Sequence, residues 1–238
     1  MSKSLSWIKN ELDDIERRGL RRNRRVIEPL PGGRCRVGDR ELWNFAGNDY
    51  LGLAQDPRVV AAAKQAADDA GAGATASALI CGRTQWHARL EAALAAFEGT
   101  EAALLFPTGF AANMGVITSV VGRDDAVFSD RLNHASLVDG CRLSKAALSI
   151  YDRRDLDALG ASLAVSSSAR RRLIVTDSVF SMDGDIAPLR ELCDLADEHD
   201  AMVMIDEAHG TGVFGERGRG AVEEAGVEER IDFRVGTL

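Results

Sequence analysis

Residues 201–220 read AMVMIDEAHGTGVFGERGRG and give the clearest indication of both fold and chemistry. The apolar run Ala201–Ile205 is typical of a buried strand, and Asp206 stands at its carboxyl end, three residues before His209. An acid in such a dry position keeps its negative charge only if something positive faces it. A protonated pyridine nitrogen or a metal ion would serve, but no third or fourth metal ligand lies at a useful spacing. We therefore interpret Asp206 as part of a ligand site at the end of a strand.

The glycines of the same stretch match a dinucleotide-binding pattern, Gly210-x-Gly212-x-x-Gly215. In that pattern the glycines open a helix directly after the strand. Here four residues from Asp206 to His209 intervene, and the Glu-Arg-Gly-Arg-Gly that follows cannot continue as a helix. The sequence therefore argues against a dinucleotide site and against an NAD(P)-dependent oxidoreductase.

Upstream of this stretch the chain alternates between short apolar runs and helical segments. Such alternation indicates crossover units and a mostly parallel, buried sheet flanked by helices, which is an α/β fold. We expect residues 55–238 to form one large α/β domain, and residues 1–54 to form an N-terminal helix and a small β arm with a hairpin at Gly38-Asp39. The expected strands of the large domain are Ala102–Phe106, Ala126–Phe128, Ala147–Ile150, Arg172–Val175 and Ala201–Ile205.

Composition excludes several classes of function. The net charge of −8 argues against nucleic acid or an anionic membrane as the main partner, in spite of the local basic cluster Arg21–Arg25. No apolar run approaches the ~18 residues of a membrane span, and the amphipathic, acidic N-terminus is unlike a signal peptide. The four cysteines lie far apart without metal-like spacing, so we expect reduced thiols in a cytoplasmic protein.

Ligands of open α/β sheets bind beyond the carboxyl ends of the strands, so the residues after each run are candidates. PTGFAANMGVI begins at Pro107 and predicts a helix start that could seat a phosphate, although a plain strand-to-helix turn would look the same. His134 begins the next helix, where it could stack on a flat ring, handle a proton or only form structural hydrogen bonds. The polar stretch TDSVFSMDGDIAP from Thr176 lacks the spacing of a calcium loop and could be a tight turn.

The strings NDYLGL, PTGFAAN, DRLNHASLVDG, VFSMDGDIAPL and IDEAHGTGVFGERGRG, in this order, resemble the α-oxoamine synthases, which belong to the class II pyridoxal-phosphate-dependent aminotransferase family. The similarity runs from about residue 20 to the end. It implies the fold of fold-type I pyridoxal-phosphate (PLP) transferases, PLP as cofactor, and a homodimer with sites at the subunit interface. It also implies an amino acid and an acyl thioester, carried on coenzyme A or a carrier protein, as small-molecule substrates.

The resemblance also implies roles for individual residues. Asp206 would pair with the pyridine nitrogen of the cofactor and His209 would bind its 3-hydroxyl oxygen, while His134 would stack on the ring and position the substrate. Further cofactor contacts would come from Gly109, Phe110, Ser181 and Thr237, the last at the phosphate. Arg21, or the neighbouring Arg22, would meet the acyl substrate.

HGTG and FSMDGDIAPL are most similar to the branch of the family that condenses L-alanine with a pimeloyl thioester and releases carbon dioxide. Branches that use glycine or serine, and a non-catalytic fragment, are the alternatives. In the family the run equivalent to VGTL continues into Ser-Lys, and that Lys forms the Schiff base. Because the sequence stops at Leu238, we expect this Lys and the C-terminal small domain to be missing, and the chain by itself to be inactive.

Overall fold

A computed structural model describes residues 3–238, which fall into two compact units, Met1–Ala61 and Ala62–Leu238. The first unit contains one amphipathic helix, α1, and a three-stranded antiparallel sheet in the order β1-β2-β3. The predicted hairpin at Gly38-Asp39 is confirmed, since it joins β2 to β3 with Cys35 opposite Leu42. The elements are η1 (Lys3–Leu5), α1 (Ser6–Arg17), β1 (Glu28–Leu30), β2 (Arg34–Val37), β3 (Arg40–Trp43) and η2 (Leu53–Gln55).

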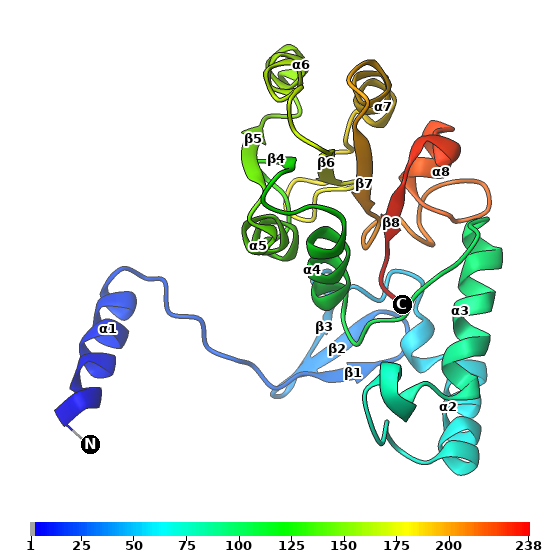
Figure 1. Ribbon diagram of the computed structural model, residues 1–238. Helices are drawn as coiled ribbons and strands as arrows, with labels where there is room; N and C mark the ends of the chain where they lie inside the picture. The colour runs from blue at the N-terminus through cyan, green and yellow to red at the C-terminus, as the bar shows by residue number, and fades with distance from the viewer. Residues whose placement is uncertain (1–2) are drawn as a thin grey trace. The chain divides into compact units, whose positions relative to one another are not determined.

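The second unit is built on a parallel sheet of five strands in the order β5-β4-β6-β7-β8 (Figure 1). This confirms the predicted α/β class. Its strands are β4 (Ala126–Asp130), β5 (Ala147–Tyr151), β6 (Arg172–Asp177), β7 (Met202–Asp206) and β8 (Phe233–Val235). The helices from Pro57 onward are α2 (Pro57–Ala70), the π-helical η3 (Ala78–Gly82), α3 (Gln85–Glu98), α4 (Gly109–Val120), α5 (Ala135–Ser144), α6 (Leu156–Val165), α7 (Leu189–Glu198), α8 (Ala221–Ala225) and η4 (Glu228–Arg230).

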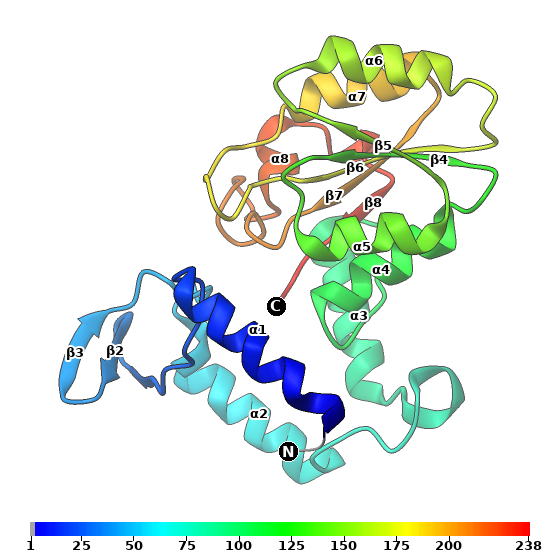
Figure 2. The same cartoon turned by 90° about the vertical axis from the view of Figure 1, so that its left-hand side faces the viewer.

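Helices cover both faces of the sheet, with α6 and α7 on one side and α4 and α5 on the other (Figure 2). The alternation of side chains along β6 explains these layers, because successive residues of a strand point to opposite faces. Ile174 packs into the core under α6 and α7, whereas Leu173 and Val175 pack into the core under α4 and α5. All three side chains are fully buried, so the central strand reads as a continuous apolar run.

The strand predicted at Ala102–Phe106 is wrong. The structure leaves this segment without a strand partner among the described residues, and Leu104 is 78% exposed. The Leu105 N–H donates to the Glu91 carboxylate at 3.4 Å, not to a neighbouring strand. An apolar run becomes a strand only where another strand pairs with its backbone. The sheet instead gains β8, which pairs with β7 and was not predicted.

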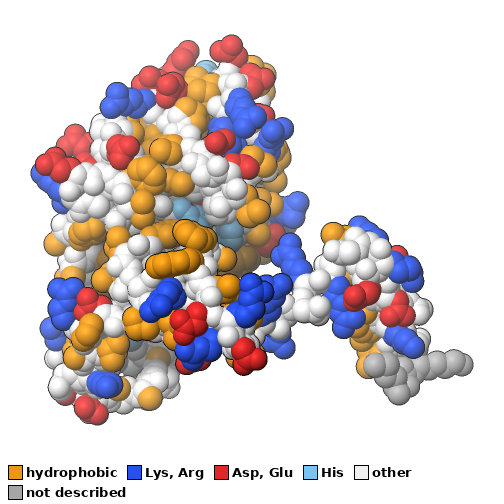
Figure 3. Space-filling view, turned by 180° about the vertical axis from the view of Figure 1, so that it is seen from behind, with side chains coloured by type: hydrophobic (Ala, Val, Ile, Leu, Met, Phe, Trp, Pro, Cys, Tyr) orange, Lys and Arg blue, Asp and Glu red, His pale blue; other side chains and the backbone are white. Residues whose placement is uncertain are grey.

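Large apolar side chains lie outside the core in the second unit. Helix α3 contains no buried residue, and Leu79 and Ile80 are 93% and 77% exposed. Figure 3 shows hydrophobic side chains gathered in groups on the surface. Exposed apolar groups of this kind mark surfaces that a partner or another segment covers. Within residues 3–238, no helix combines the length and apolar character that a bilayer span requires.

Candidate active site

The carboxyl ends of β6 and β7 place two acids side by side. Asp177 and Asp206 are the last residues of these strands and stand opposite each other in the parallel register. Both are buried, with exposed fractions of 6% and 5%. The Asp206 carboxylate accepts hydrogen bonds from the Asn113 side-chain Nδ2 at 2.6 Å and from the Ala208 backbone N–H at 2.8 Å. Asp206 is therefore oriented by α4 as well as by its own strand.

Asn113 connects Asp206 to His134. Its Nδ2 also donates to Ser136 Oγ at 2.9 Å, and Ser136 Oγ lies 2.7 Å from His134 Nδ1. Asn113 and Ser136 are buried, whereas His134 lies at the surface as the N-cap residue of α5. A continuous hydrogen-bonded path thus leads from the strand-end acid to an imidazole ring that ligands can reach.

Asp177 contacts the backbone at the start of α5. Its Oδ2 accepts the His134 backbone N–H at 2.7 Å, and its own N–H donates to Asn133 Oδ1 at 3.1 Å. Burial raises the pKa of the Asp177 carboxyl to about 7, and the nearby charges of Asp206 and Asp130 act in the same direction. Asp177 thus combines a structural role with a pKa close to neutrality.

We expect this shift to make the free energy of unfolding fall with pH. The unfolded carboxyl titrates near 3.8, and the folded one near 7, so between these values the folded state keeps a proton that the unfolded state has lost. Asp177→Asn removes this proton difference. As the pH rises from about 4.5 to 6.5, the free energy of unfolding of the wild type should therefore fall relative to that of the variant by up to ~1.4 kcal/mol per pH unit. Urea unfolding across this range measures the difference, and parallel curves would contradict it.

Glu207, the next residue after Asp206, faces the other way. Its carboxylate accepts the Ser178 hydroxyl at 2.7 Å and the backbone N–H of Val222 at 2.7 Å, at the start of α8. A Cβ on Gly210 or Gly220 would lie within 2.5 Å of this carboxylate, so only glycine fits around it. Burial raises the pKa of Glu207. The hydrogen bonds of Glu207 all hold the fold together, so Asp206 is the better candidate of the two acids for contacting a ligand.

The start of α4 offers backbone donors. Thr108 caps the helix, taking the Ala111 N–H on its side chain at 3.0 Å and the Ala112 N–H on its carbonyl at 3.0 Å. The amides of Gly109 and Phe110 precede these bonds and face outward from the first turn. A Cβ on Gly109 would lie 2.7 Å from Thr237 Cγ2, so Thr237 lies directly against this turn. The first turn of α4 thus offers two helix amides, an arrangement suited to a phosphate, and the methyl group of Thr237 packs beside them.

With the site described, the comparisons identify the family. The family model "Aminotransferase class I and II" matches residues 40–238. The chain belongs to this family. The predicted membership in the PLP-dependent aminotransferases is thereby confirmed.

Relatives within the class I and II aminotransferase family cover nearly all of this chain. An 8-amino-7-oxononanoate synthase from Anaeromyxobacter sp. (strain K) is 54% identical over 235 residues, which are 99% of this chain and 59% of the relative. A serine palmitoyltransferase from Sphingomonas wittichii matches in structure with a TM-score of 0.90 and 38% identity, over 99% of this chain and 59% of its own. A variant of the serine palmitoyltransferase from S. paucimobilis, with a bound PLP–myriocin aldimine, matches with a TM-score of 0.90 and 34% identity, over 98% of this chain and 59% of its own. The chain thus spans about three fifths of the length of these relatives.

The structure also places the other residues that the family resemblance singled out. Ser181 is exposed in the turn after β6, and His209 is half-buried in the turn after β7. Arg21 belongs to the first unit, where it forms an ion pair with Glu16 at 2.9 Å, and Arg22 is exposed in the same unit. The roles predicted for these four residues stay predictions.

The sequence patterns did not single out Asn113, and they predicted no role for Ser136 or Asp177. A signal for Asn113 was present, because it is the one polar side chain in the first two turns of α4, GFAANMGV. Its partner Asp206 is 93 positions away in the sequence, so only the folded chain shows what it contacts. In a family whose members share this fold, such a buried amide is a functional candidate.

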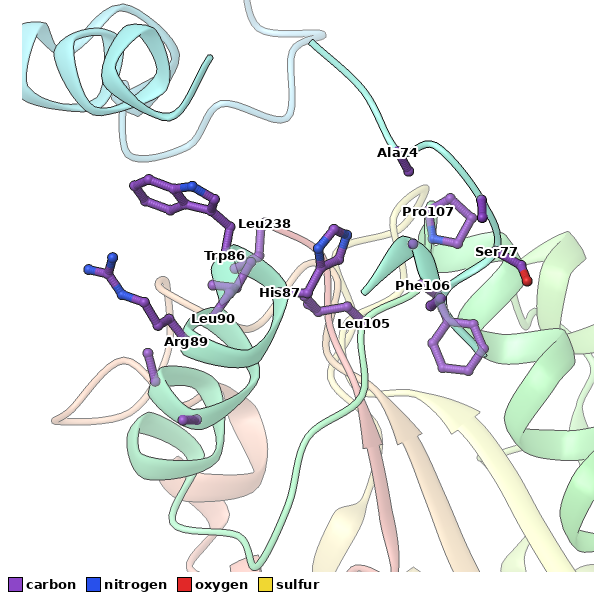
Figure 4. A pocket seen from close by; sticks show the side chains of 15 residues that line it. Ala74, Ser77, Trp86, His87, Arg89, Leu90, Leu105, Phe106, Pro107 and Leu238 are labelled. Atoms are coloured by element: carbon purple, nitrogen blue, oxygen red, sulfur yellow. The ribbon is translucent and has the colours of Figure 1, made fainter. Parts of the chain in front are cut away.

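A mainly apolar cavity of about 1200 Å³ adjoins the start of α4. In Figure 4, Trp86 and Leu90 of α3 lie on one side of it and Phe106 and Pro107 on the other, with Leu238 also in the lining. Pro107 directly precedes the capping residue Thr108. The cavity is therefore next to the first turn of α4.

Proposed function

We propose that the complete gene product is a PLP-dependent acyltransferase that condenses L-alanine with a pimeloyl thioester and releases carbon dioxide, as an 8-amino-7-oxononanoate synthase. The observation that carries this proposal is the buried Asp206 carboxylate at the end of β7, which Asn113 holds in place and which is joined through Asn113 and Ser136 to the exposed ring of His134. Identity of about half to relatives with that name supports the choice of substrates.

The residues present fit PLP. Asp206 supplies a fixed negative charge in a site that is 5% exposed, which suits a protonated pyridine nitrogen. The first turn of α4 supplies backbone donors for a phosphate, with Thr237 beside it. His134, which Ser136 and Asn113 connect to Asp206, presents an exposed ring for stacking. Acid, ring and phosphate donors come from three elements at one end of the sheet, which matches a flat ligand with a charged nitrogen and a phosphate arm.

When bound, PLP supplies an electron sink for a carbanion at the α-carbon of the amino acid. The chain's own residues hold and orient the reactants. Asp206 keeps the ring nitrogen protonated, Gly109, Phe110, Ser181 and Thr237 position the cofactor, and His209 binds its 3-hydroxyl oxygen. His134 positions the amino acid, and Arg21 or Arg22 meets the acyl substrate. The 238 residues alone are proposed to bind the cofactor without turnover, because the resemblance puts the Schiff-base lysine directly after the VGTL run.

We also propose a homodimer in the cytoplasm. The exposed apolar side chains of the second unit, such as Leu79 and Ile80, support an interface. The four cysteines are free thiols, which suits a reducing compartment.

A turnover assay tests the proposed function. The complete gene product is incubated with PLP, either a pimeloyl or a long-chain acyl thioester, and L-alanine, glycine or L-serine in turn. We expect release of carbon dioxide and of free thiol with alanine, at a kcat/KM at least tenfold above the other two. Preference for serine with a long acyl thioester would favour the second candidate, a serine palmitoyltransferase, which the structural similarity at a TM-score of 0.90 suggests. No turnover with any pair would refute both.

A further inference from the structure

The hydrogen bonds around Asn113 have a defined direction. Ionised Asp206 can only accept, so the Asn113 atom 2.6 Å from it must be the NH₂ group and not the carbonyl oxygen. An NH₂ group has two hydrogens, and the second points at Ser136 Oγ at 2.9 Å. The charge of Asp206 thus fixes which way the Asn113 amide faces.

The unpaired carbonyl of Asn113 supports this orientation. Asn113 is 1% exposed, and its Oδ1 has no hydrogen-bond partner within the described residues. A buried acceptor without a partner is costly. The amide therefore keeps its orientation because both hydrogens of its NH₂ group form hydrogen bonds, to Asp206 and Ser136, and not because its oxygen has a partner.

Ser136 extends this chain of hydrogen bonds to His134. Its oxygen accepts from Asn113, which leaves its hydrogen available to the other neighbour, His134 Nδ1, 2.7 Å away. The Ser136 backbone N–H donates to the same Nδ1 at 3.3 Å. Two donors converge on this nitrogen, which leaves no place for a hydrogen of its own.

We propose that Asn113 and Ser136 are positioning residues that link Asp206 to His134. The hydrogen-bond directions that the charge of Asp206 imposes on them hold the neutral His134 ring in the tautomer with the proton on Nε2. The exposed edge of the ring then presents an N–H donor to the site and not a lone pair. His134 consequently offers a hydrogen bond to an acceptor oxygen and does not remove a proton through Nε2. This last consequence rests on the proposed function, whereas the tautomer itself does not.

The tautomer can be measured without cofactor or substrate. The chain is labelled with ¹⁵N at its histidines, and long-range ¹H–¹⁵N correlation spectra are recorded at a pH where the rings are neutral, with His134→Gln identifying the His134 signals. We expect an unprotonated-type shift at Nδ1 and a protonated-type shift at Nε2. A protonated Nδ1 in the neutral wild-type ring would overturn the proposal, whatever the variants do.

Two variants test the link to the tautomer. Asn113→Ala frees the Ser136 hydroxyl, and Ser136→Ala removes it, so in both the ¹⁵N shifts of Nδ1 and Nε2 should move toward each other as the second tautomer becomes populated. Ser119→Ala, on an exposed residue of the same helix, is the control and should leave both shifts unchanged. Unchanged ¹⁵N shifts of His134 in both Asn113→Ala and Ser136→Ala would refute the proposed link to the tautomer, because residues with a merely structural role would leave these shifts unchanged.

The outcome is separable from that of the proposed function. If the turnover assay fails while Nε2 holds the proton, the proposed tautomer of His134 is correct and the proposed enzymatic function is wrong. If turnover succeeds while Nδ1 holds the proton, only the proposed tautomer is wrong.

Discussion

Asp206→Asn is expected to lower the kcat/KM of the complete gene product roughly a hundred- to a thousandfold, the factor that corresponds to the loss of one partner of a buried charge pair. The substitution preserves the size of the side chain but removes its charge, and it sets an amide opposite the Asn113 NH₂ group 2.6 Å away. The nitrogen of a bound ring would then lose the anion that keeps it protonated. Steady-state kinetics with saturating PLP measure the effect, and a cofactor titration separates weaker binding from slower turnover.

Asp157→Asn serves as the matched control for this loss of activity. Asp157 is an exposed acid in the first turn of α6 and touches none of the proposed site residues. Its variant should keep the wild-type kcat/KM within a factor of about two, as surface changes usually alter little. If Asp206→Asn stayed within tenfold of this control, the role assigned to Asp206 would be wrong.

Arg153→Met is expected to lower the free energy of unfolding by about 3 kcal/mol, because it leaves the buried Asp130 carboxylate without its cation. The Arg153 side chain is 4% exposed and ion-pairs with Asp185 and, at 4.0 Å, with Asp130, whose side chain is fully buried. Its guanidinium also lies over the Phe180 ring, 4.1 Å from the centroid. Methionine replaces the stem but not the charge. Urea unfolding at pH 7, followed by circular dichroism, measures the change.

The neighbouring residue supplies the control for this stability effect. Arg154 also ion-pairs with Asp185, at 3.5 Å, but its side chain is 69% exposed. Arg154→Met should therefore cost no more than ~0.5 kcal/mol, since exposed ion pairs contribute little. Equal losses for the two variants would show that the burial of Arg153 does not matter.

The central strands could be predicted because each is a short apolar run that is buried on both faces, as in β6 and β7. The segment Ala102–Phe106 has the same composition and is not a strand, because pairing depends on a neighbour that no local pattern reveals. The missed strand β8 shows the converse. Phe233–Val235 is short and contains the charged residue Arg234, so it lacks the apolar run that predicts a strand. In the structure it pairs with β7, and the Arg234 guanidinium donates to the Glu98 backbone carbonyl at 2.7 Å.

The sequence by itself determined the α/β class, the family and the acid at the end of β7, because these depend on local patterns and on strings of adjacent residues. Only the tertiary structure decided that Asn113 of α4 holds Asp206 while Glu207 caps α8. It also decided that Asn113 joins Asp206 to Ser136 and His134. The physical reason is that hydrogen bonds between residues 23 and 93 positions apart depend on how strands and helices pack, which no spacing in the sequence specifies.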